Sequence, residues 1–364
     1  MKNDFTCGFV GLGLIGGSIA RALRQRYAGC HLLAYDINQE ALQAAKKEGV
    51  IDLPLSSLDS HLSLCDYLFL CAPISDNHSL LGEIQKYLSP TCLLTDVGSV
   101  KSGIHEHIEK AGLSRQFIGG HPMAGSERTG YVNSKALLLE NAYYILTPCR
   151  EVSEDAVKDF RQLIVSLGAL PLVLSCKRHD HITAAISHLP HIVAASLVNL
   201  IERSDSDEGI MKMIAAGGFK DITRIASSSP GMWQQICLAN GENISGLLGD
   251  YIEALKEIKT QIDSANSGEL YSFFDSARRY RDSFIDASSG PIKKSFSISV
   301  DIADEPGALA SIATILALQQ LNIKNIGIVH NREQENGVLK VELYQEEDIA
   351  RAGAILRARG YSVY

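Results

Sequence analysis

Residues 11–17 read Gly11-Leu12-Gly13-Leu14-Ile15-Gly16-Gly17, and this stretch is the strongest indication of the fold of the first part of the chain. It follows a short apolar run and opens a helical pattern, which is the context that a dinucleotide-binding fingerprint requires. In such a turn Gly11 makes the bend, Gly13 admits a pyrophosphate, and Gly16 lets the helix pack closely on the strand. Leu14 and Ile15 would then offer the phosphates the free backbone N–H groups of a helix N-terminus.

Asp36 ends the next apolar run, about twenty residues after Gly16. An acidic side chain at this point of the fingerprint hydrogen-bonds the adenosine ribose, and its charge repels the 2′-phosphate of NADP. The sequence therefore predicts NAD as the cofactor.

Short apolar runs alternate with helical patterns from residue 5 to about residue 174. The runs are almost continuously apolar, which is typical of parallel strands covered on both faces. The alternation predicts an α/β fold with a mostly parallel, doubly wound, Rossmann-like sheet in residues 1–176. We expect its helices at residues 15–26, 40–47, 79–88, 103–110 and 154–167.

The strand pattern stops near residue 177, so residues 177–286 are predicted to form an all-helical domain. Its helices are expected at residues 180–202, 209–225, 232–263 (with Gly241 as a point where it could break) and 268–285. A linker rich in helix breakers follows at 287–294. Residues 295–364 have the element order β-α-β-β-α-β, which predicts a small ferredoxin-like α+β domain.

The composition of the 364 residues, 46% hydrophobic and 21% charged, is that of a globular protein with two or three domains. A net charge of -8 argues against nucleic acid as a partner. The eight cysteines include no Cys-x-x-Cys pair, so we expect buried thiols of a cytoplasmic protein and no metal site. No uninterrupted apolar run approaches the length of a bilayer span, and the first strand leaves no room for a signal peptide, so no membrane association is expected.

One histidine lies in a glycine-rich stretch, Gly119-Gly120-His121-Pro122-Met123-Ala124-Gly125-Ser126-Glu127. Imidazole takes up or gives a proton near neutral pH, and the flanking glycines let backbone approach a ligand closely. These features suit a general acid or base. A turn between two strands with an incidental histidine would give the same stretch, so these residues alone leave both interpretations open.

A second candidate is Ser99, in Thr95-Asp96-Val97-Gly98-Ser99-Val100-Lys101. This stretch follows a later strand, on the edge of a doubly wound sheet where ligands bind. Ser99 could orient His121 or contact a reacting group. It could equally cap the helix that follows, a role that serine often fills.

Further histidines lie in the helical segment. His188 and His191 in Ser187-His188-Leu189-Pro190-His191 share a helix face, and Pro190 indicates a kink or a helix start. The two histidines could bind a metal, but no carboxylate or cysteine stands at ligand spacing from them. The alternative is that they pack in the core or cap a helix. We expect His179 and His181 to cap the start of their helix.

Cations suited to an anionic substrate follow in Gly217-Gly218-Phe219-Lys220-Asp221-Ile222-Thr223-Arg224. Lys220 and Arg224 are one helical turn apart, and arginine binds carboxylates through two parallel hydrogen bonds. The only tryptophan, Trp233, could form a wall of the same pocket. A solvated charged face and a core tryptophan are the alternatives.

At these motifs the chain resembles the prephenate dehydrogenase family of tyrosine biosynthesis. The matching stretches are Gly-Leu-Ile-Gly-Gly-Ser at 13–18, Asp-Val-Gly-Ser-Val-Lys at 96–101, Gly-His-Pro-Met-Ala-Gly-Ser-Glu at 120–127, Ser-His-Leu-Pro-His at 187–191, Gly-Gly-Phe-Lys-Asp-Ile-Thr-Arg-Ile-Ala at 217–226 and Met-Trp at 232–233. Met123 and Ser126 stand where other members carry Ile and Thr, and both changes are mild.

The resemblance implies NAD-dependent oxidative decarboxylation of prephenate to 4-hydroxyphenylpyruvate. It implies that His121 accepts the proton of the ring hydroxyl with help from Ser99, and that Arg224 with Lys220 holds the ring carboxylate. The rest of the substrate pocket would consist of His191, Ser126, Glu127 and Trp233. In this family the helical domain also forms the dimer, so a homodimer is expected.

The tail resembles an ACT domain, a small module that senses amino acids. The similarity lies in Asp304-Glu305-Pro306-Gly307-Ala308-Leu309 and Leu321-Asn322-Ile323-Lys324-Asn325-Ile326. It implies feedback regulation by an aromatic amino acid, with tyrosine as the expected effector.

Two other functions remain open. The substrate could be arogenate, which carries an amine where prephenate has a ketone. The chain could instead be a non-catalytic, amino-acid-responsive protein that binds NAD, although His121, Ser99 and Arg224 argue against this. The sequence leaves open whether prephenate or arogenate is strictly preferred, which effector binds and whether it inhibits or activates, and whether the oligomer is larger than a dimer.

Overall fold

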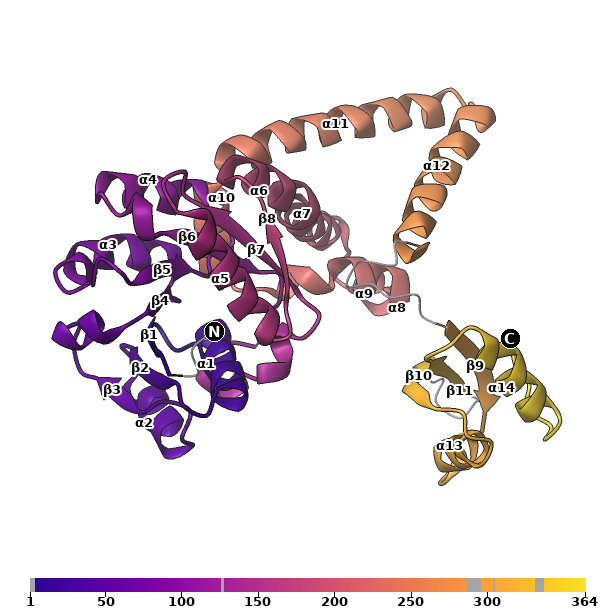
Figure 1. Cartoon of the computed structure of the whole chain (residues 1–364). Helices are drawn as coiled ribbons and strands as arrows, with labels where there is room; N and C mark the ends of the chain where they lie inside the picture. Colours follow the sequence, from indigo (N-terminus) through magenta and orange to yellow (C-terminus); the bar gives the residue numbers. More distant parts are fainter. Residues whose placement is uncertain (1–3, 126–127, 287–295, 304, 331–336) are drawn as a thin grey trace. The chain divides into compact units, whose positions relative to one another are not determined.

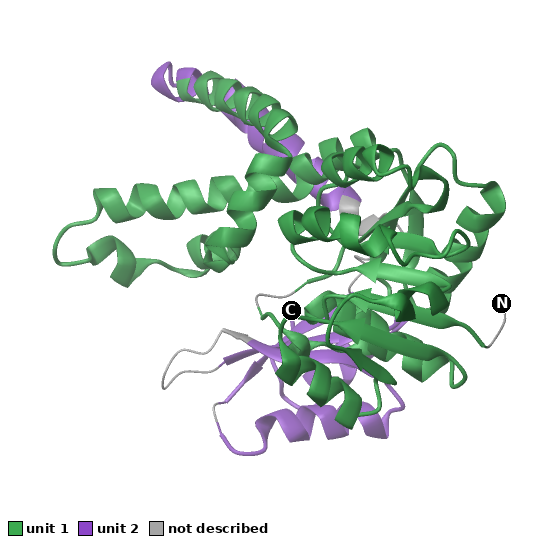
Figure 2. Cartoon of the chain, turned by 90° about the vertical axis from the view of Figure 1, so that its left-hand side faces the viewer, with its two compact units in different colours: residues 1–259 green, residues 260–364 purple. Residues whose placement is uncertain are grey.

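The structure is a computed structural model that describes residues 4–125, 128–286, 296–303, 305–330 and 337–364. The chain forms two compact units, Met1–Lys259 and Thr260–Tyr364, which Figure 2 colours separately. The boundary between them falls within a long helix, α11 (Gly241–Asp263). Each unit is described by itself.

The first unit begins with a five-stranded parallel sheet in the order β3-β2-β1-β4-β5. Its strands are β1 (Thr6–Val10), β2 (His31–Tyr35), β3 (Leu53–Leu55), β4 (Tyr67–Leu70) and β5 (Leu93–Asp96). Strand β3 was not predicted, because it has three residues and a proline at its centre. Such a residue is tolerated only because β3 lies at the edge of the sheet, where one side needs no partner.

Helices cover both faces of this sheet, as the apolar runs predicted. Phe69 of β4 packs on one face with Leu23 of α1 (Leu14–Arg26) and Phe160 of α5 (Glu154–Ser166). Its neighbours Leu68 and Leu70 point to the other face, into a second cluster with side chains of α3 (Ile74–Gln85) and α4 (Ser102–Lys110). Helix α2 (Gln39–Lys47) follows β2 (Figure 1). The doubly wound, Rossmann-like sheet is therefore confirmed.

Helix α3 begins five residues before the predicted start at Ser79. Pro73 caps it in an extended conformation, and Asp76 lies in its first turn, where a carboxylate interacts favourably with the helix dipole. The apolar pattern used for the prediction marks only the later, packed turns of this helix.

Three further strands continue the first unit in the order β6-β7-β8. They are β6 (Ile118–Pro122), β7 (Tyr143–Pro148) and β8 (Leu170–Val173). Strands β6 and β7 are antiparallel, while β7 and β8 are parallel. A parallel bridge between Leu94 and Phe117 sets β6 beside β5, so both strands end at the same edge.

The helical segment consists of α6 (Cys176–Thr183), the π-helical turn η5 (Ala184–His188), α7 (Leu189–Ser204), α8 (Ile210–Ile214), α9 (Gly217–Thr223), the 3-10 turn η6 (Arg224–Ser227), α10 (Pro230–Ala239) and α11. The single helix expected at 209–225 is wrong. Ala216 is extended and the glycine pair follows it, so the segment breaks into α8, α9 and η6. The break expected near Gly241 is confirmed and falls at Asn240.

Residues Cys176–Ser204 form a continuous helical run of 29 residues. By length and composition this run could cross a membrane, contrary to the expectation that no segment has that capacity. A helix that packs within a globular fold can pass the same test, and α6 contacts α4 of the sheet domain. The run also contains buried polar side chains, among them His179, Asp180 and His188.

The second unit contains α12 (Ser267–Asp286), β9 (Phe296–Ile302), α13 (Ala308–Leu318), β10 (Ile323–His330), β11 (Gly337–Leu343) and α14 (Glu347–Arg357). The strands form an antiparallel sheet in the order β10-β11-β9 around a core that includes Val300, Leu316 and Val341. The last strand expected at 361–364 is present only as a bridge between Val363 and Val300. The predicted linker 287–294, Ser295 and Asp304 lie outside the described residues.

Candidate active site

The glycine-rich loop has the geometry that its sequence predicted. Gly11 has a φ of +94°, and a Cβ there would come within 2.7 Å of the Ala72 backbone nitrogen. A Cβ on Gly16 would lie 2.6 Å from the carbonyl oxygen of Gly11, so the helix packs this closely only because residue 16 is glycine. Gly13 faces open space, with no atom within 4 Å of an added Cβ.

Helix α1 starts at Leu14 with no side-chain cap and no acidic residue in its first turn. Its first N–H groups, which include those of Leu14 and Ile15, have no partners within the helix and favour an anion. The open space at Gly13 and this uncapped N-terminus fit the pyrophosphate of a dinucleotide.

Asp36 serves the same loop in a way that the sequence did not predict. Its carboxylate accepts hydrogen bonds from the Leu12 N–H at 2.5 Å and from the Asn38 N–H at 2.7 Å. It thereby ties the glycine loop to the end of β2. A carboxylate offers about four acceptor positions, so these two bonds leave capacity for ribose hydroxyls.

His121 lies at the end of β6, and its half-buried ring is linked to a second histidine. The His121 Nδ1 is 2.8 Å from the His179 Nε2, and the His179 Nδ1 is 2.7 Å from the Asp180 Oδ1. The expectation that His179 caps a helix is wrong, because its ring is fully buried and Ser175 caps α6 instead. His181 is exposed, and the described N-cap of α6 does not involve it.

Asp180 is anchored at the N-terminus of α4. Its Oδ1 accepts from the Lys101 N–H and its Oδ2 from the Ser102 N–H, both at 2.7 Å. Burial alone would raise the pKa of Asp180, but its hydrogen bonds with His179, Ser102 and the Lys101 backbone outweigh that and lower it. Asp180 is therefore a carboxylate at neutral pH.

Lys101 and Asp96 form a buried ion pair that contacts the backbone next to His121. The Lys101 ammonium also donates to the Gly120 carbonyl at 2.7 Å, and the Gly120 N–H donates to Asp96 at 3.1 Å. The pair thus fixes the backbone of the residue that precedes His121. Ser99 is half-buried nearby in the chain, and its expected alternative role as the N-cap of α4 is wrong, since Lys101 occupies that position.

The second pair of histidines surrounds Trp233. The His191 ring stacks on the indole with centroids 3.8 Å apart, and the His188 ring meets it edge-on at 5.9 Å. Asn240 bonds both the His188 Nδ1 and the Asp180 carbonyl, which connects this group to the His121 chain. Among the described residues, the buried indole N–H of Trp233 has no hydrogen-bond partner.

Burial lowers the pKa of each of the four histidines near this site. Burial, and then the proximity of His179, Lys101 and His188, holds the pKa of His121 well below its ordinary value. Burial likewise lowers the pKa of His179, against the opposing effect of Asp180, and lowers the pKa of His188 to about 4. Burial also lowers the pKa of His191. All four rings are neutral at pH 7.

Arg224 lies close enough to His191 for its charge to lower the pKa of that ring further. Lys220 lies in α9, and Arg224 is the C-cap residue of α9 and the first residue of η6. Both side chains are exposed. The predicted pocket residues Ser126 and Glu127 lie outside the described residues.

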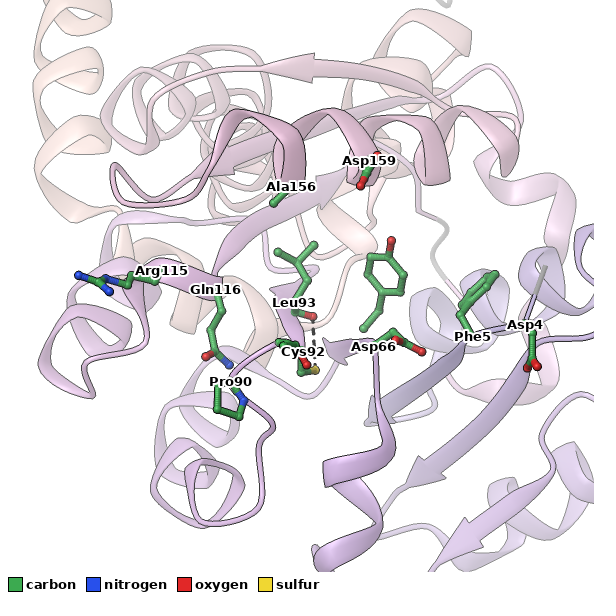
Figure 3. Close-up of a pocket in the computed structure, with 12 residues that line it drawn as sticks. Asp4, Phe5, Asp66, Pro90, Cys92, Leu93, Arg115, Gln116, Ala156 and Asp159 are labelled. Atoms are coloured by element: carbon green, nitrogen blue, oxygen red, sulfur yellow. Dashed lines mark hydrogen bonds between the residues drawn. The ribbon is translucent and has the colours of Figure 1, made fainter. Parts of the chain in front are cut away.

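A cavity of about 420 Å³ is lined by none of the site residues described above. Figure 3 shows its lining residues in close-up. Its walls include Phe5, Asp66, Leu93 and Asp159, and the first three are at the amino ends of β1, β4 and β5. Ligands of such sheets bind at the carboxyl ends, where the glycine loop and His121 are, so this cavity is not the candidate site. No group of three or more His, Cys, Asp or Glu side chains that could hold a metal occurs in the described part of the chain.

A dinucleotide-binding sheet with a neutral histidine at its carboxyl edge defines the class as NAD-dependent oxidoreductases. Residues 19–172 match the nucleotide-binding domain of prephenate dehydrogenase, and residues 175–276 match its dimerization domain. The chain belongs to the prephenate dehydrogenase family. The helical run Cys176–Ser204 lies within the segment that matches the dimerization domain.

Individual relatives agree with this assignment. A prephenate dehydrogenase of Bacillus subtilis (strain 168) is 38% identical over 96% of this chain and 95% of its own. The crystal structure of prephenate dehydrogenase from A. aeolicus with hydroxyphenyl propionate and NAD+ superposes with a TM-score of 0.73 at 31% identity, over 77% of this chain and 98% of that chain. Synechocystis arogenate dehydrogenase has a TM-score of 0.69 at 31% identity, over 77% of this chain and 100% of that chain.

Substitutions at two glycines of the loop should affect stability and cofactor binding separately. Gly11→Ala forces a methyl group onto the Ala72 backbone at a positive φ and should lower the free energy of unfolding by about 1–3 kcal/mol. Gly13→Ala meets no atom, so it should leave the melting temperature unchanged and weaken NAD binding, because its methyl group intrudes on the phosphate site. Thermal melting and NAD titration of both variants test this. Equal melting temperatures for the two would contradict it.

Proposed function

We propose that this chain catalyses the NAD-dependent oxidative decarboxylation of prephenate to 4-hydroxyphenylpyruvate. The observation that carries the proposal is the neutral ring of His121, held by His179 at the carboxyl edge of the sheet that carries the glycine loop. A general base is useful only if it is unprotonated at the working pH, and burial gives His121 that property.

The reaction assigns a task to each group. His121 accepts the proton of the ring hydroxyl, with Ser99 assisting it. NAD, held at the glycine loop, would supply the acceptor for the hydride that leaves the same carbon. The electrons of the C–C bond to the ring carboxylate then restore aromaticity as carbon dioxide leaves, so the protein has to position the substrate, take one proton and hold charge.

Substrate binding is assigned to the second group of side chains. Arg224 with Lys220 holds the ring carboxylate, and a guanidinium suits this task because it can form two parallel hydrogen bonds. His191, Ser126, Glu127 and Trp233 complete the pocket. The proximity of Arg224 to His191 and the stacking of His191 on Trp233 support the grouping of these three.

The cofactor site is assigned to Gly11, Gly13, Leu14, Ile15, Gly16 and Asp36. The open space at Gly13 and the uncapped start of α1 support it. Asp36 would disfavour NADP, because its carboxylate repels a 2′-phosphate.

We also infer that the enzyme is a cytoplasmic homodimer with domains at 1–176, 177–286 and 295–364 and a linker at 287–294. Dimer formation through the helical domain is supported by large apolar side chains that a single chain leaves exposed on α7 and α11, among them Leu200, Ile252 and Leu255. An interface that buries such side chains would remove their apolar surface from water.

Arogenate is the second candidate substrate, because the chain is similar to an arogenate dehydrogenase of solved structure. NADH production from purified prephenate and purified arogenate separates the two. A rate with prephenate that is far below the rate with arogenate would overturn the first assignment, and no NADH from either would favour a protein that binds NAD without catalysis.

His121→Asn tests the general base. Asparagine keeps some hydrogen bonding but accepts no proton, so kcat should fall by roughly 10²–10⁴ while NAD affinity stays unchanged. In the unaltered enzyme the pKa of His121 is lowered, so its base form is already present at pH 6.5. The rise in kcat that accompanies deprotonation of His121 should therefore lie below pH 6.5, and this group should cause no further change in kcat above that pH. Near-normal turnover of the variant would assign the proton to another residue.

Arg224→Ala tests the carboxylate contact. The variant should bind prephenate much more weakly and NAD normally, because only the substrate presents a carboxylate to this cation. Arg224→Lys should recover part of the loss, since it keeps the charge and loses the paired hydrogen bonds. Equal losses of prephenate and NAD affinity would indicate a structural role instead.

The tail is proposed to be an ACT domain of ferredoxin-like fold that senses tyrosine. Its core of residues such as Val300, Leu316 and Val341 supports independent folding. The B. subtilis relative matches over 96% of this chain, which therefore includes the tail. The turn at Gly307, with a φ of +96°, and the strand at Asn325 would offer backbone and amide groups to an amino acid.

A chain that ends at Ser289 tests this role. It should keep its activity and lose most of its inhibition by tyrosine, since allosteric coupling is typically about 1–3 kcal/mol, or roughly 5–150-fold in affinity. Initial rates at increasing tyrosine concentration, compared with the full chain, give the result. Full inhibition of the shortened chain would mean that tyrosine competes at the active site.

A further inference from the structure

We propose that His179 and Asp180 are positioning residues that hold His121 in the tautomer with its proton on Nδ1, so that Nε2 is the atom that accepts the substrate proton. The proposal rests on the proposed role of His121 as general base. It concerns two buried side chains of α6 that the sequence motifs did not single out as part of the site.

The tautomer follows from the order of the hydrogen bonds. The ionised carboxylate of Asp180 can only accept, so the His179 Nδ1, 2.7 Å away, must donate. A neutral imidazole carries one proton, which leaves the His179 Nε2 as an acceptor. That nitrogen is 2.8 Å from the His121 Nδ1, which must therefore donate. His121 then has no proton on Nε2.

The direction of this chain depends on the charge of Asp180. Two backbone N–H groups at the start of α4, those of Lys101 and Ser102, point at its two carboxylate oxygens. A helix N-terminus favours a negative charge. It presents only N–H donors, so a protonated Asp180 would find no acceptor there for its O–H. Both features keep Asp180 an acceptor, so His179 cannot turn over into the opposite tautomer.

The same chain stabilises the product of proton transfer. When the His121 Nε2 takes the ring hydroxyl proton, the imidazolium keeps its Nδ1–H bond to the His179 Nε2. The Asp180 carboxylate lies one ring further away and compensates the new positive charge within a buried region. The Asp96 carboxylate is already paired with the Lys101 ammonium. Asp180, which is bonded to His179, is therefore the carboxylate that compensates a positive charge on His121.

The first test reads the tautomer directly. Magic-angle-spinning NMR of the full-length protein labelled with [13C,15N]histidine distinguishes protonated from unprotonated ring nitrogens, and the His121→Asn spectrum identifies the signals of His121. We expect a protonated Nδ1 and an unprotonated Nε2 in the resting enzyme at pH 7.5. A proton on the His121 Nε2 would overturn the proposal. This result does not depend on turnover, so it stands or fails separately from the assignment of prephenate as substrate.

The second test removes the charge of the chain with Asp180→Asn. Each oxygen of Asp180 accepts from a backbone N–H, so an amide nitrogen at either position would face a donor, and the amide oxygen is favoured at the position shared by His179 and Lys101. The neutral amide cannot compensate the positive charge that His121 gains on proton transfer, so we expect kcat to fall by roughly 10²–10⁴ while NAD affinity stays unchanged. An unchanged kcat would contradict the proposal.

Substitutions of His179 separate positioning from packing. His179→Ala removes the acceptor, whereas the amide of His179→Gln can accept from His121 and donate to Asp180, so the glutamine variant should retain a clearly higher kcat than the alanine variant. A matched control is the exposed pair His61 and Asp59, with its Nδ1 and Oδ1 2.8 Å apart. His61→Gln and Asp59→Asn should leave kcat unchanged. Equal kcat values for His179→Ala and His61→Gln would overturn the proposal, and NAD titration and melting show whether each variant is folded.

Discussion

Asp180 is the side chain on which the geometry of the site depends most. Its two oxygens accept the first backbone N–H groups of α4, and its neighbour His179 reaches the ring of His121. One carboxylate therefore joins the helical segment to the sheet domain and to the candidate base. Because its pKa is lowered in the folded chain, Asp180 stabilises the fold above its ordinary pKa, and this contribution is lost as the pH falls toward the lowered value.

The Lys101–Asp96 pair plays a comparable part at Gly120, the residue before His121. Both side chains are buried, so each has lost its hydration, and removal of either one would leave an uncompensated charge at a cost of about 3–5 kcal/mol. Burial lowers the pKa of Lys101, and Asp96 opposes that shift. What the pair provides is position: both partners bond the backbone of Gly120, where an added Cβ would come within 2.6 Å of the Asp96 carbonyl oxygen.

The elements that the sequence predicted well are those whose packing repeats along the chain. Strands β1, β2, β4 and β5 are buried on both faces, and their apolar runs are evident without a structure. The errors occur where local and tertiary preferences differ. Strand β3 is too short to show a period, the first turns of α3 are polar, and α8 and α9 are separated because Ala216 and two glycines favour an extended break over a continuous helix.

The glycine loop, Asp36 and the candidate residues His121, Arg224 and Trp233 can be identified from the sequence, because each belongs to a short motif whose chemistry depends on neighbours along the chain. The surroundings of His121, in contrast, depend on how distant segments pack. His179 is 58 positions away from it, and the Asp180 carboxylate meets α4 across 79 positions. No periodicity or spacing encodes such contacts, because they form only when the helical segment packs on the sheet. The proton on His121 is set by that packing, since the tautomer of a buried imidazole follows from the partner of its other nitrogen.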